Sequence, residues 1–176
     1  KSTFINQVTN TKAKVGAYAF TTTRPQLGVV SHKGREFVLA DIPGLIAGAA
    51  EGAGIGDRFL GHIERCRILI HLIDATGDDP VEAWHTVCDE LAAYGAGLDE
   101  KPQIVALNKG DLLGEELMAD IAQQLEAAGA KEVIPISGAT GEGVDKVLDR
   151  VIAELPEKSS VETSRGDDEE GGWSPI

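Results

Sequence analysis

Apolar positions in the second half of the chain alternate between short continuous runs and helical spacing. The runs at 67–74 and 103–107 are almost uninterrupted, as expected of strands that helices cover on both faces. Between them, apolar residues recur at helical spacing after Pro80, which suits the first turn of a helix. Three more elements complete the series: a helix over 115–128, a strand over 132–136 and a helix over 144–155. This alternation predicts an α/β fold with a parallel sheet and crossover helices.

The first part of the chain is more polar and predicts shorter elements. Phe4, Ile5 and Val8 have helical spacing and predict a helix that packs on the sheet. The other elements predicted here are a loop over 9–18, strands over 27–32 and 36–40 around a hairpin turn, and a helix over 57–65.

The stretch from 36 to 55 has the composition of a nucleotide switch. Its apolar strand ends at Asp41, and ligands bind at the carboxyl ends of strands in open α/β sheets. Pro43 and Gly44 form a turn that leaves the Gly44 backbone N–H open to close approach, and more glycines follow. An acid, an accessible amide and a glycine-rich segment suit the sensing of a phosphate and its metal. Asp-x-x-Gly is common by chance, so this hypothesis depends on the other motifs.

Two hydroxyl-rich segments could contact the same phosphates. Lys1, Ser2 and Thr3 match the end of the pattern Gly-x-x-x-x-Gly-Lys-[Ser/Thr], which places a Lys ammonium on the β- and γ-phosphates and a hydroxyl on Mg²⁺. On this hypothesis the chain starts inside its own motif; the alternative is a plain helix start with a serine cap. The threonines at 21–23 offer a further hydroxyl to Mg²⁺, or else form an extended segment that ends before Pro25.

The sequence Asn-Lys-Gly-Asp at 108–111 follows the strand at 103–107 and is the most specific chemical signal in the chain. The Asp111 carboxylate can accept hydrogen bonds from the N1–H and N2–H₂ groups of guanine, a donor pair that adenine lacks. Asn108 can brace the phosphate loop and reach the base. The Lys109 stem can lie on the purine face with its ammonium outward. These residue types predict a guanine site.

Ser137, Gly138 and Ala139 begin the loop between the strand at 132–136 and the last helix. The Ser137 hydroxyl can orient Asp111, and a backbone N–H near Gly138 can donate to guanine O6. Alone this is a generic strand-to-helix loop, but it is the fifth motif of an ordered set.

Composition limits the alternatives. The net charge of −13 argues against a broad basic face that grips nucleic acid. Cys66 and Cys88 offer neither a disulfide framework nor a metal spacing, and no apolar run is long enough to span a bilayer, so we expect a reducing, cytoplasmic location. Residues 1–155 are predicted to form one domain, and 156–176 an acidic, disordered tail. Trp173 in that tail is either without a role or part of a docking motif.

Taken in order, these motifs resemble those of translation-factor-type P-loop GTPases. More narrowly, residues 18–22, 27–30, 41–56 and 58–66 are similar to the bacterial Obg (CgtA) family of GTPases. The resemblance covers 1–155, an Obg-type GTPase domain truncated at its N-terminus. It implies a P-loop NTPase three-layer sandwich with a mostly parallel sheet, in which the first strand and the P-loop are truncated. The family carries a glycine-rich domain before the GTPase domain.

The sequence departs from the family pattern at a few places. Ala17 and Ala19 flank Tyr18 where Asp and Pro are usual, which changes the expected shape of the first switch. Gly138 replaces the alanine of the base loop, which keeps a backbone donor and adds conformational freedom. Gly110 replaces a bulkier residue, with little expected effect on the flanking side chains.

By motif position, the resemblance implies a Mg²⁺-dependent GTP/GDP site. Lys1 would bind phosphate, Ser2 and Thr22 would ligate Mg²⁺, and Asp41 would hold the ion through water. The Gly44 N–H would meet the γ-phosphate, so Lys1, Thr22 and Gly44 are the expected catalytic positions. The full set of implied nucleotide contacts is Lys1, Ser2, Thr3, Phe20, Thr21, Thr22, Thr23, Arg24, Asp41, Ile42, Pro43, Gly44, Asn108, Lys109, Gly110, Asp111, Ser137, Gly138 and Ala139.

Leu45 stands where Ras-like enzymes place the glutamine that orients the attacking water. Neither Leu45 nor Ile46 can hydrogen-bond water, so we expect slow intrinsic hydrolysis, at or below about 10⁻⁴ to 10⁻² s⁻¹. A partner or a monovalent cation would supply the missing element. Without its glycine loop, the chain as given is expected to bind GTP far more weakly than an intact relative.

The resemblance implies a monomeric switch that acts in large ribosomal subunit assembly and in growth and stress control, with guanine alarmones as further candidate ligands. The alternative is a non-catalytic platform that binds pre-ribosomal particles according to its nucleotide state. An adenine-nucleotide kinase or ATPase is disfavoured by Asp111.

Overall fold

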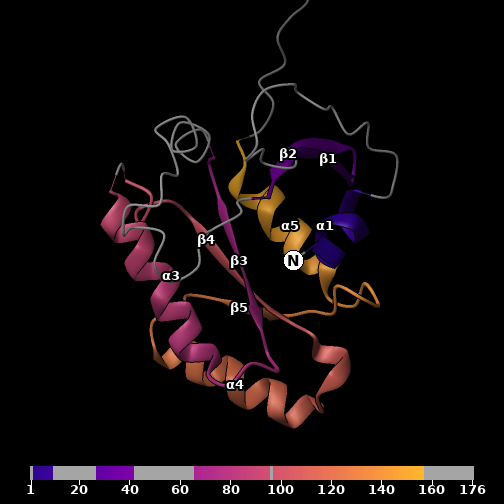
Figure 1. Ribbon diagram of the computed structural model, residues 1–176. Coiled ribbons are helices and arrows are strands. Elements are labelled where there is room, and N and C mark those ends of the chain that lie inside the picture. Colours follow the sequence, from indigo (N-terminus) through magenta and orange to yellow (C-terminus); the bar gives the residue numbers. More distant parts are fainter. Residues whose placement is uncertain (1, 10–26, 42–65, 96, 157–176) are drawn as a thin grey trace, which may run out of the picture.

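The computed structural model describes residues 2–9, 27–41, 66–95 and 97–156, and arranges them in three layers (Figure 1). Residues 10–18 of the predicted loop, the predicted helix over 57–65 and residues 157–176 of the predicted tail lie outside the described residues. In chain order the elements are α1 (Ser2–Thr9), β1 (Leu27–His32), β2 (Arg35–Ala40), β3 (Leu69–Asp74), α3 (Pro80–Tyr94), β4 (Gln103–Asn108), the 3-10 helix η1 (Gly110–Leu112), α4 (Glu115–Ala127), β5 (Val133–Pro135) and α5 (Val144–Glu154).

The described strands form two sheets. β3, β4 and β5 are parallel, with Asp74 opposite Asn108 and Leu107 opposite Pro135, which confirms the predicted parallel sheet and its crossover helices. β1 and β2 form a separate antiparallel hairpin around the predicted turn. Because the carboxyl ends of parallel strands meet at one edge, the segments that follow β3, β4 and β5 lie together.

Each face of the parallel sheet carries its own apolar core, because successive side chains of a strand point to opposite faces. In β4, Ile104 and Ala106 pack with α1 and α5, whereas Val105 and Leu107 pack with α3 and α4. Figure 1 shows α1 and α5 on one side of β3 and β4, and α3 and α4 on the other. The buried residues of the α1–α5 side are Phe4, Ile5, Val8, Val30, Ile104, Ala106, Ile134, Ile136, Val144, Val147, Leu148 and Val151.

Local side-chain chemistry sets the ends of the helices. Asp79 caps α3 by accepting a hydrogen bond from the Glu82 N–H at 2.9 Å, and Pro80 follows it in the first turn. Thr9, predicted to start a loop, is instead the last residue of α1, and its hydroxyl donates to the Ile5 carbonyl at 2.6 Å. Helix α4 ends before Gly129, whose φ of 118° is unfavourable for residues with a Cβ.

The hairpin turn between β1 and β2 is attached to the end of α5. The Arg35 guanidinium donates to the Ile152 carbonyl in the last turn of α5 at 2.9 Å and to the Pro156 carbonyl just after the helix at 2.7 Å. One turn earlier, Asp149 accepts from Lys33 at 2.6 Å and from His32 at 2.8 Å. These hydrogen bonds hold the pKa of the Asp149 carboxyl below its usual value, and the bond from Lys33 has a larger effect than the bond from His32.

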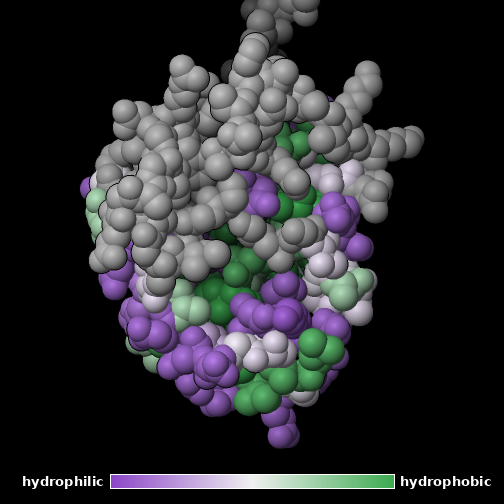
Figure 2. Space-filling view, in the orientation of Figure 1, coloured by the Kyte–Doolittle hydropathy of each residue, from purple (hydrophilic) through white to green (hydrophobic). Residues whose placement is uncertain are grey.

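The surface in Figure 2 is largely hydrophilic over α3 and α4. An apolar area lies over the start of α4 and the turn before it, where Leu112 is 64% and Leu117 is 48% exposed. Among the described residues, no helix has the length and hydrophobicity needed to cross a bilayer.

Candidate nucleotide site

The candidate site lies at the carboxyl edge of the parallel sheet, where the segments after β3, β4 and β5 are hydrogen-bonded to one another. The Ala75 N–H donates to the Asn108 carbonyl at 2.9 Å, and the Ile136 N–H donates to the Leu107 carbonyl at 2.8 Å. The Gly110 N–H donates back to the Ile136 carbonyl at 2.9 Å. The ladder therefore continues past the strands and fixes the positions of the loops that carry the polar side chains.

The backbone turns sharply at Lys109, which has a left-handed conformation with φ 71° and ψ 31°. Such a conformation is unfavourable for a residue with a Cβ and persists where the surrounding structure fixes it, often at functional sites. The turn leads into η1, where Asp111 lies in the first turn and is exposed. The Asp111 carboxylate is thus held at the surface of the sheet edge, open to a ligand.

Ser137 orients the Asp111 carboxylate as the sequence predicts. Its hydroxyl donates to Asp111 Oδ1 at 2.6 Å, and Ser137 itself is only 1% exposed. The same hydroxyl oxygen accepts from the Thr140 N–H at 3.1 Å, so both functions of the hydroxyl are used. The Ser137 backbone N–H donates to the Glu142 carbonyl at 2.8 Å, which closes the loop on itself.

Asn108 braces the base loop in this structure. Its Oδ1 accepts from the Gly138 N–H at 2.9 Å. This is the amide region that the sequence predicts as the donor to guanine O6. A guanine that uses the Gly138 N–H must therefore share that donor with Asn108 or displace the Asn108 amide.

Two glycines of these loops occupy tight positions. A Cβ on Gly138 would lie 3.3 Å from the Phe4 backbone nitrogen in the first turn of α1. Gly138 is buried against this helix, so a Cβ there would require its neighbours to shift by a few tenths of an ångström. A Cβ on Gly110 would lie 3.1 Å from the Ile136 carbonyl oxygen and 3.2 Å from the Met118 Cε, so a bulkier residue there would require small shifts of these neighbours.

Lys109 forms an ion pair with Asp74, the last residue of β3. Its Nζ lies 2.6 Å from Asp74 Oδ2, and both side chains are 46% exposed. Asp74 Oδ1 accepts from the Thr76 N–H at 2.9 Å and from the Thr76 hydroxyl at 2.7 Å. Burial raises the pKa of Asp74, but the hydrogen bonds from Lys109 and Thr76 outweigh it and leave that pKa below its usual value.

The structure brings together the predicted base-binding residues 108–111 and 137–138, and Ala139 is exposed in the same loop. Thr3 is exposed in α1, and Asp41 is half-buried directly after β2. Ser2 begins α1, and its side chain is not described. The remaining predicted residues lie outside the described part of the chain: Lys1, Phe20, Thr21, Thr22, Thr23, Arg24, Ile42, Pro43 and Gly44.

Asp74 and Thr76 are site residues that the sequence reasoning missed. Asp74 is an acid at the end of a buried strand, which is the same signal that identified Asp41. No group of three or more His, Cys, Asp or Glu side chains in the described part of the chain is arranged to hold a metal ion.

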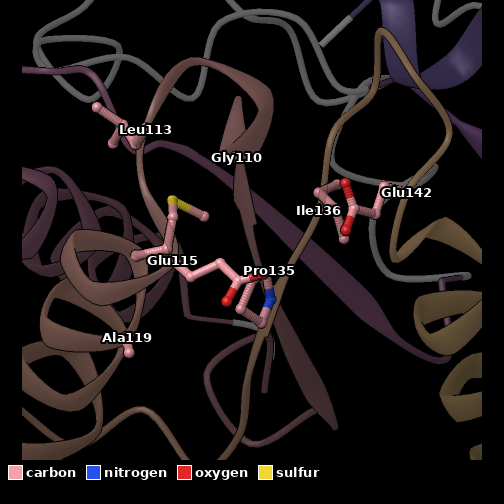
Figure 3. Close-up of a pocket in the computed structure, with 8 residues that line it drawn as sticks. Gly110, Leu113, Glu115, Ala119, Pro135, Ile136 and Glu142 are labelled. Carbon is pink, nitrogen blue, oxygen red and sulfur yellow. The ribbon is translucent and has the colours of Figure 1, made fainter.

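A cavity of about 270 Å³ opens beside the base loops (Figure 3). Glu115 and Ala119 line it from α4, and Leu113 lines it from the segment between η1 and α4. Pro135 at the end of β5 and Ile136 directly after it line the other side. Asn108, Lys109 and Asp111 are not among its lining residues. Of the predicted nucleotide contacts in the described part of the chain, only Gly110 lines this cavity.

Comparison with known proteins identifies the family of the chain. The model of a family described as 50S ribosome-binding GTPase matches residues 1–109. The chain belongs to this GTPase family. Its motifs at 1–3 and 41–44 fall within the matched segment. The motif at 108–111 begins inside the segment and extends two residues past its end.

The resemblance to Obg proteins is also confirmed. The chain is 67% identical to the GTPase Obg of Erythrobacter litoralis and 66% identical to that of Novosphingobium aromaticivorans, in each case over its whole length. It covers 51% of each of these proteins, so the chain spans about half the length of the curated relatives it matches.

Solved structures confirm the predicted P-loop GTPase fold. The G domain of the T. maritima FeoB iron transporter aligns with a TM-score of 0.60 and 18% identity, covering 88% of this chain and 90% of that one. The cytosolic domain of the same transporter in a GDP form aligns with a TM-score of 0.61 and 19% identity, covering 90% of this chain and 59% of that one. At this identity the likeness concerns the fold alone.

Proposed function

We propose that the chain forms the guanine-recognising part of a GTPase that hydrolyses GTP to GDP and phosphate. The observation that carries the proposal is the 2.6 Å hydrogen bond from the buried Ser137 to Asp111, which aims a carboxylate at the carboxyl edge of the sheet. A fixed carboxylate acceptor matches the N1–H and N2–H₂ donors of guanine. Adenine would leave the carboxylate without donors, and sites of this kind reject such analogues by about 10⁴-fold to 10⁵-fold.

The phosphate half of the site would be completed by residues mostly outside the described part of the chain. Ser2, Thr22 and Asp41 would hold Mg²⁺, which neutralises charge on the β- and γ-phosphates when bound. Hydroxyl and carboxylate oxygens are the ligands that Mg²⁺ prefers, and Asp41 is half-buried at a strand end, which supports its assignment. Lys1 would bind the phosphates, and the Gly44 N–H would contact the γ-phosphate.

Turnover by this protein would be slow without help. Leu45 and Ile46, which follow the Asp-x-x-Gly turn, cannot orient a water molecule. An activating partner or a monovalent cation would supply that element. The description of the matched family supports the large ribosomal subunit or its precursors as this partner, in the cytoplasm, with the GTPase cycle serving as a switch in subunit assembly.

The proposal is tested by Asp111→Asn in the intact protein. An asparagine keeps one oxygen that can accept from the guanine N1–H, but its NH₂ group would face the guanine N2–H₂ group, which is also a donor. Xanthine has a carbonyl at C2 instead, and the asparagine NH₂ group can donate to it. We expect GTP affinity to fall by about 100-fold or more, because hydrogen bonds to a charged group are lost, and XTP affinity to rise. Asp145→Asn is the matched control, since Asp145 is exposed in the first turn of α5.

Fluorescent-nucleotide titrations with GTP, XTP and ATP measure the three affinities. Unchanged GTP affinity in Asp111→Asn, or ATP binding by the wild-type protein equal to its GTP binding, would refute guanine recognition through Asp111. Single-turnover hydrolysis with and without large-subunit particles then distinguishes a GTPase from a platform that only binds: hydrolysis that the particles accelerate supports the first, and GTP that stays intact under both conditions supports the second.

A further inference from the structure

The ion pair between Lys109 and Asp74 connects two strand ends that the base must approach. Asp74 ends β3, Lys109 follows β4, and the register places Asp74 directly beside Asn108. The Lys109 backbone is fixed in the left-handed conformation, so its side chain leaves the turn in a constrained direction. At its far end the ammonium lies 2.6 Å from the Asp74 carboxylate. The aliphatic stem is therefore held at both ends.

Asp74 is itself held in place. One carboxylate oxygen accepts two hydrogen bonds from Thr76, at 2.9 Å from the N–H and 2.7 Å from the hydroxyl, and the other oxygen faces Lys109. The turn after β3 is further fixed by the bond from the Ala75 N–H to the Asn108 carbonyl at 2.9 Å. The carboxylate is therefore a fixed anchor, unlike a flexible surface charge that pairs by chance.

We propose that Asp74 is a positioning residue for guanine nucleotides, which acts by holding the Lys109 side chain as a flat apolar support for the purine ring. A Lys stem lies well on an apolar surface while its ammonium stays in water or in an ion pair. Fixing the stem before the ligand arrives reduces the rotamer entropy that binding would otherwise cost. This inference rests on the proposed function, because it assumes that Lys109 and Asp111 contact the base.

The role differs from that of Asp111 in a way that can be measured. Asp111 would read the hydrogen-bonding edge of the base, whereas Lys109 would contact its face. Loss of the Asp74 anchor should therefore weaken GDP and IDP, the inosine analogue without the 2-amino group, by the same factor. Loss of Ser137 or Asp111 should affect GDP more than IDP.

The test is Asp74→Asn in the intact protein, because an asparagine oxygen can still accept from Thr76 while the charge that holds Lys109 is removed. We expect release of fluorescent GDP to accelerate about three-fold to five-fold, as for the loss of a half-exposed ion pair, with little change in the association rate. High salt, which screens the ion pair, should raise the rate of GDP release from the wild-type protein towards that of the variant. The same substitution in a Lys109→Met background should have no further effect.

Asp78→Asn is the control, because it removes an exposed carboxylate from the same loop. Removing a negative charge near a nucleotide should by itself slow GDP release, so opposite effects of the two variants distinguish anchoring from general electrostatics. Additive effects of Asp74→Asn and Lys109→Met, different factors for GDP and IDP, or GDP release unchanged in Asp74→Asn would each overturn the inference. A wild-type protein that binds no guanine nucleotide would instead refute the proposed function.

Discussion

Ser137→Ala is the sharpest perturbation of the base site, because one hydroxyl serves two partners there. The hydroxyl donates to Asp111 Oδ1 at 2.6 Å and accepts from the Thr140 N–H at 3.1 Å. Ser137 is 1% exposed, so water cannot easily take the place of the lost hydroxyl. The alanine therefore frees Asp111 to rotate and leaves a backbone N–H without an acceptor.

The expected cost follows from the kind of bond that is lost. A hydrogen bond to a charged group contributes about 1.5–3 kcal/mol, and a short O–H···O⁻ bond belongs to the strong class. Part of this free-energy cost is the same in the free and the bound protein, so it does not change the binding affinity. We therefore expect GDP affinity to fall about ten-fold, equivalent to about 1.4 kcal/mol. The affinity for IDP should fall less, because IDP lacks the 2-amino group and donates to only one of the two Asp111 carboxylate oxygens.

The assay is a fluorescent-nucleotide titration of the intact protein with GDP and IDP, together with thermal unfolding in the absence of nucleotide. Thr140→Ala is the matched control, since it deletes a hydroxyl from the same loop that does not contact Asp111. A Ser137→Ala protein that is folded and binds GDP as tightly as Thr140→Ala would refute the view that Ser137 sets the Asp111 geometry. An equal loss for GDP and IDP would place the effect elsewhere in the loop.

Two further predictions concern stability. Arg35→Ala removes the donor to the Ile152 and Pro156 carbonyls at the end of α5 and should lower the free energy of unfolding by about 1–2 kcal/mol, whereas Arg67→Ala, at an exposed arginine, should leave it unchanged in the same urea titration. Burial lowers the pKa of His71 to about 4, so the unfolded chain binds a proton below pH 6.5 while the folded chain does not. Stability should therefore fall by about 2 kcal/mol from pH 7 to pH 5 through this residue. His71→Leu should abolish that part of the pH dependence, and His85→Leu, at an exposed histidine, should keep it.

The sequence predicts the parallel sheet well, because strands buried on both faces have an unmistakable apolar pattern. β3, β4, β5, α4 and α5 appear within about two residues of their predicted bounds, and α3 begins at Pro80 as predicted. The errors are local and have identifiable causes. A hydroxyl bond to Ile5 extends α1 to Thr9, and strand pairing takes Arg35 out of the predicted turn.

The recognition residues of the base site could be predicted because each has a distinctive side chain at a strand end. Asp74 was missed because its role depends on a partner 35 positions away in the chain (Lys109, on the neighbouring strand's loop), and a single sequence does not show that register. The use of the Gly138 N–H by Asn108 could not be predicted either, since it depends on how two loops 30 positions apart in the chain meet. The sequence pattern identifies candidate site residues, whereas the hydrogen bonds and ion pairs between them become visible only in the fold.

The tight packing at Gly138 connects base recognition to the helix that begins with the predicted phosphate and metal ligands. A Cβ at this position would lie 3.3 Å from the backbone nitrogen of Phe4, one turn into α1. Phe4 is 1% exposed and shares a core with Val147 of α5, whose helix follows the base loop. Because protein interiors are close-packed, a shift of the base loop would press on α1 and α5. A base held at Asp111 would therefore lie beside a loop whose Gly138 packs directly against the start of α1.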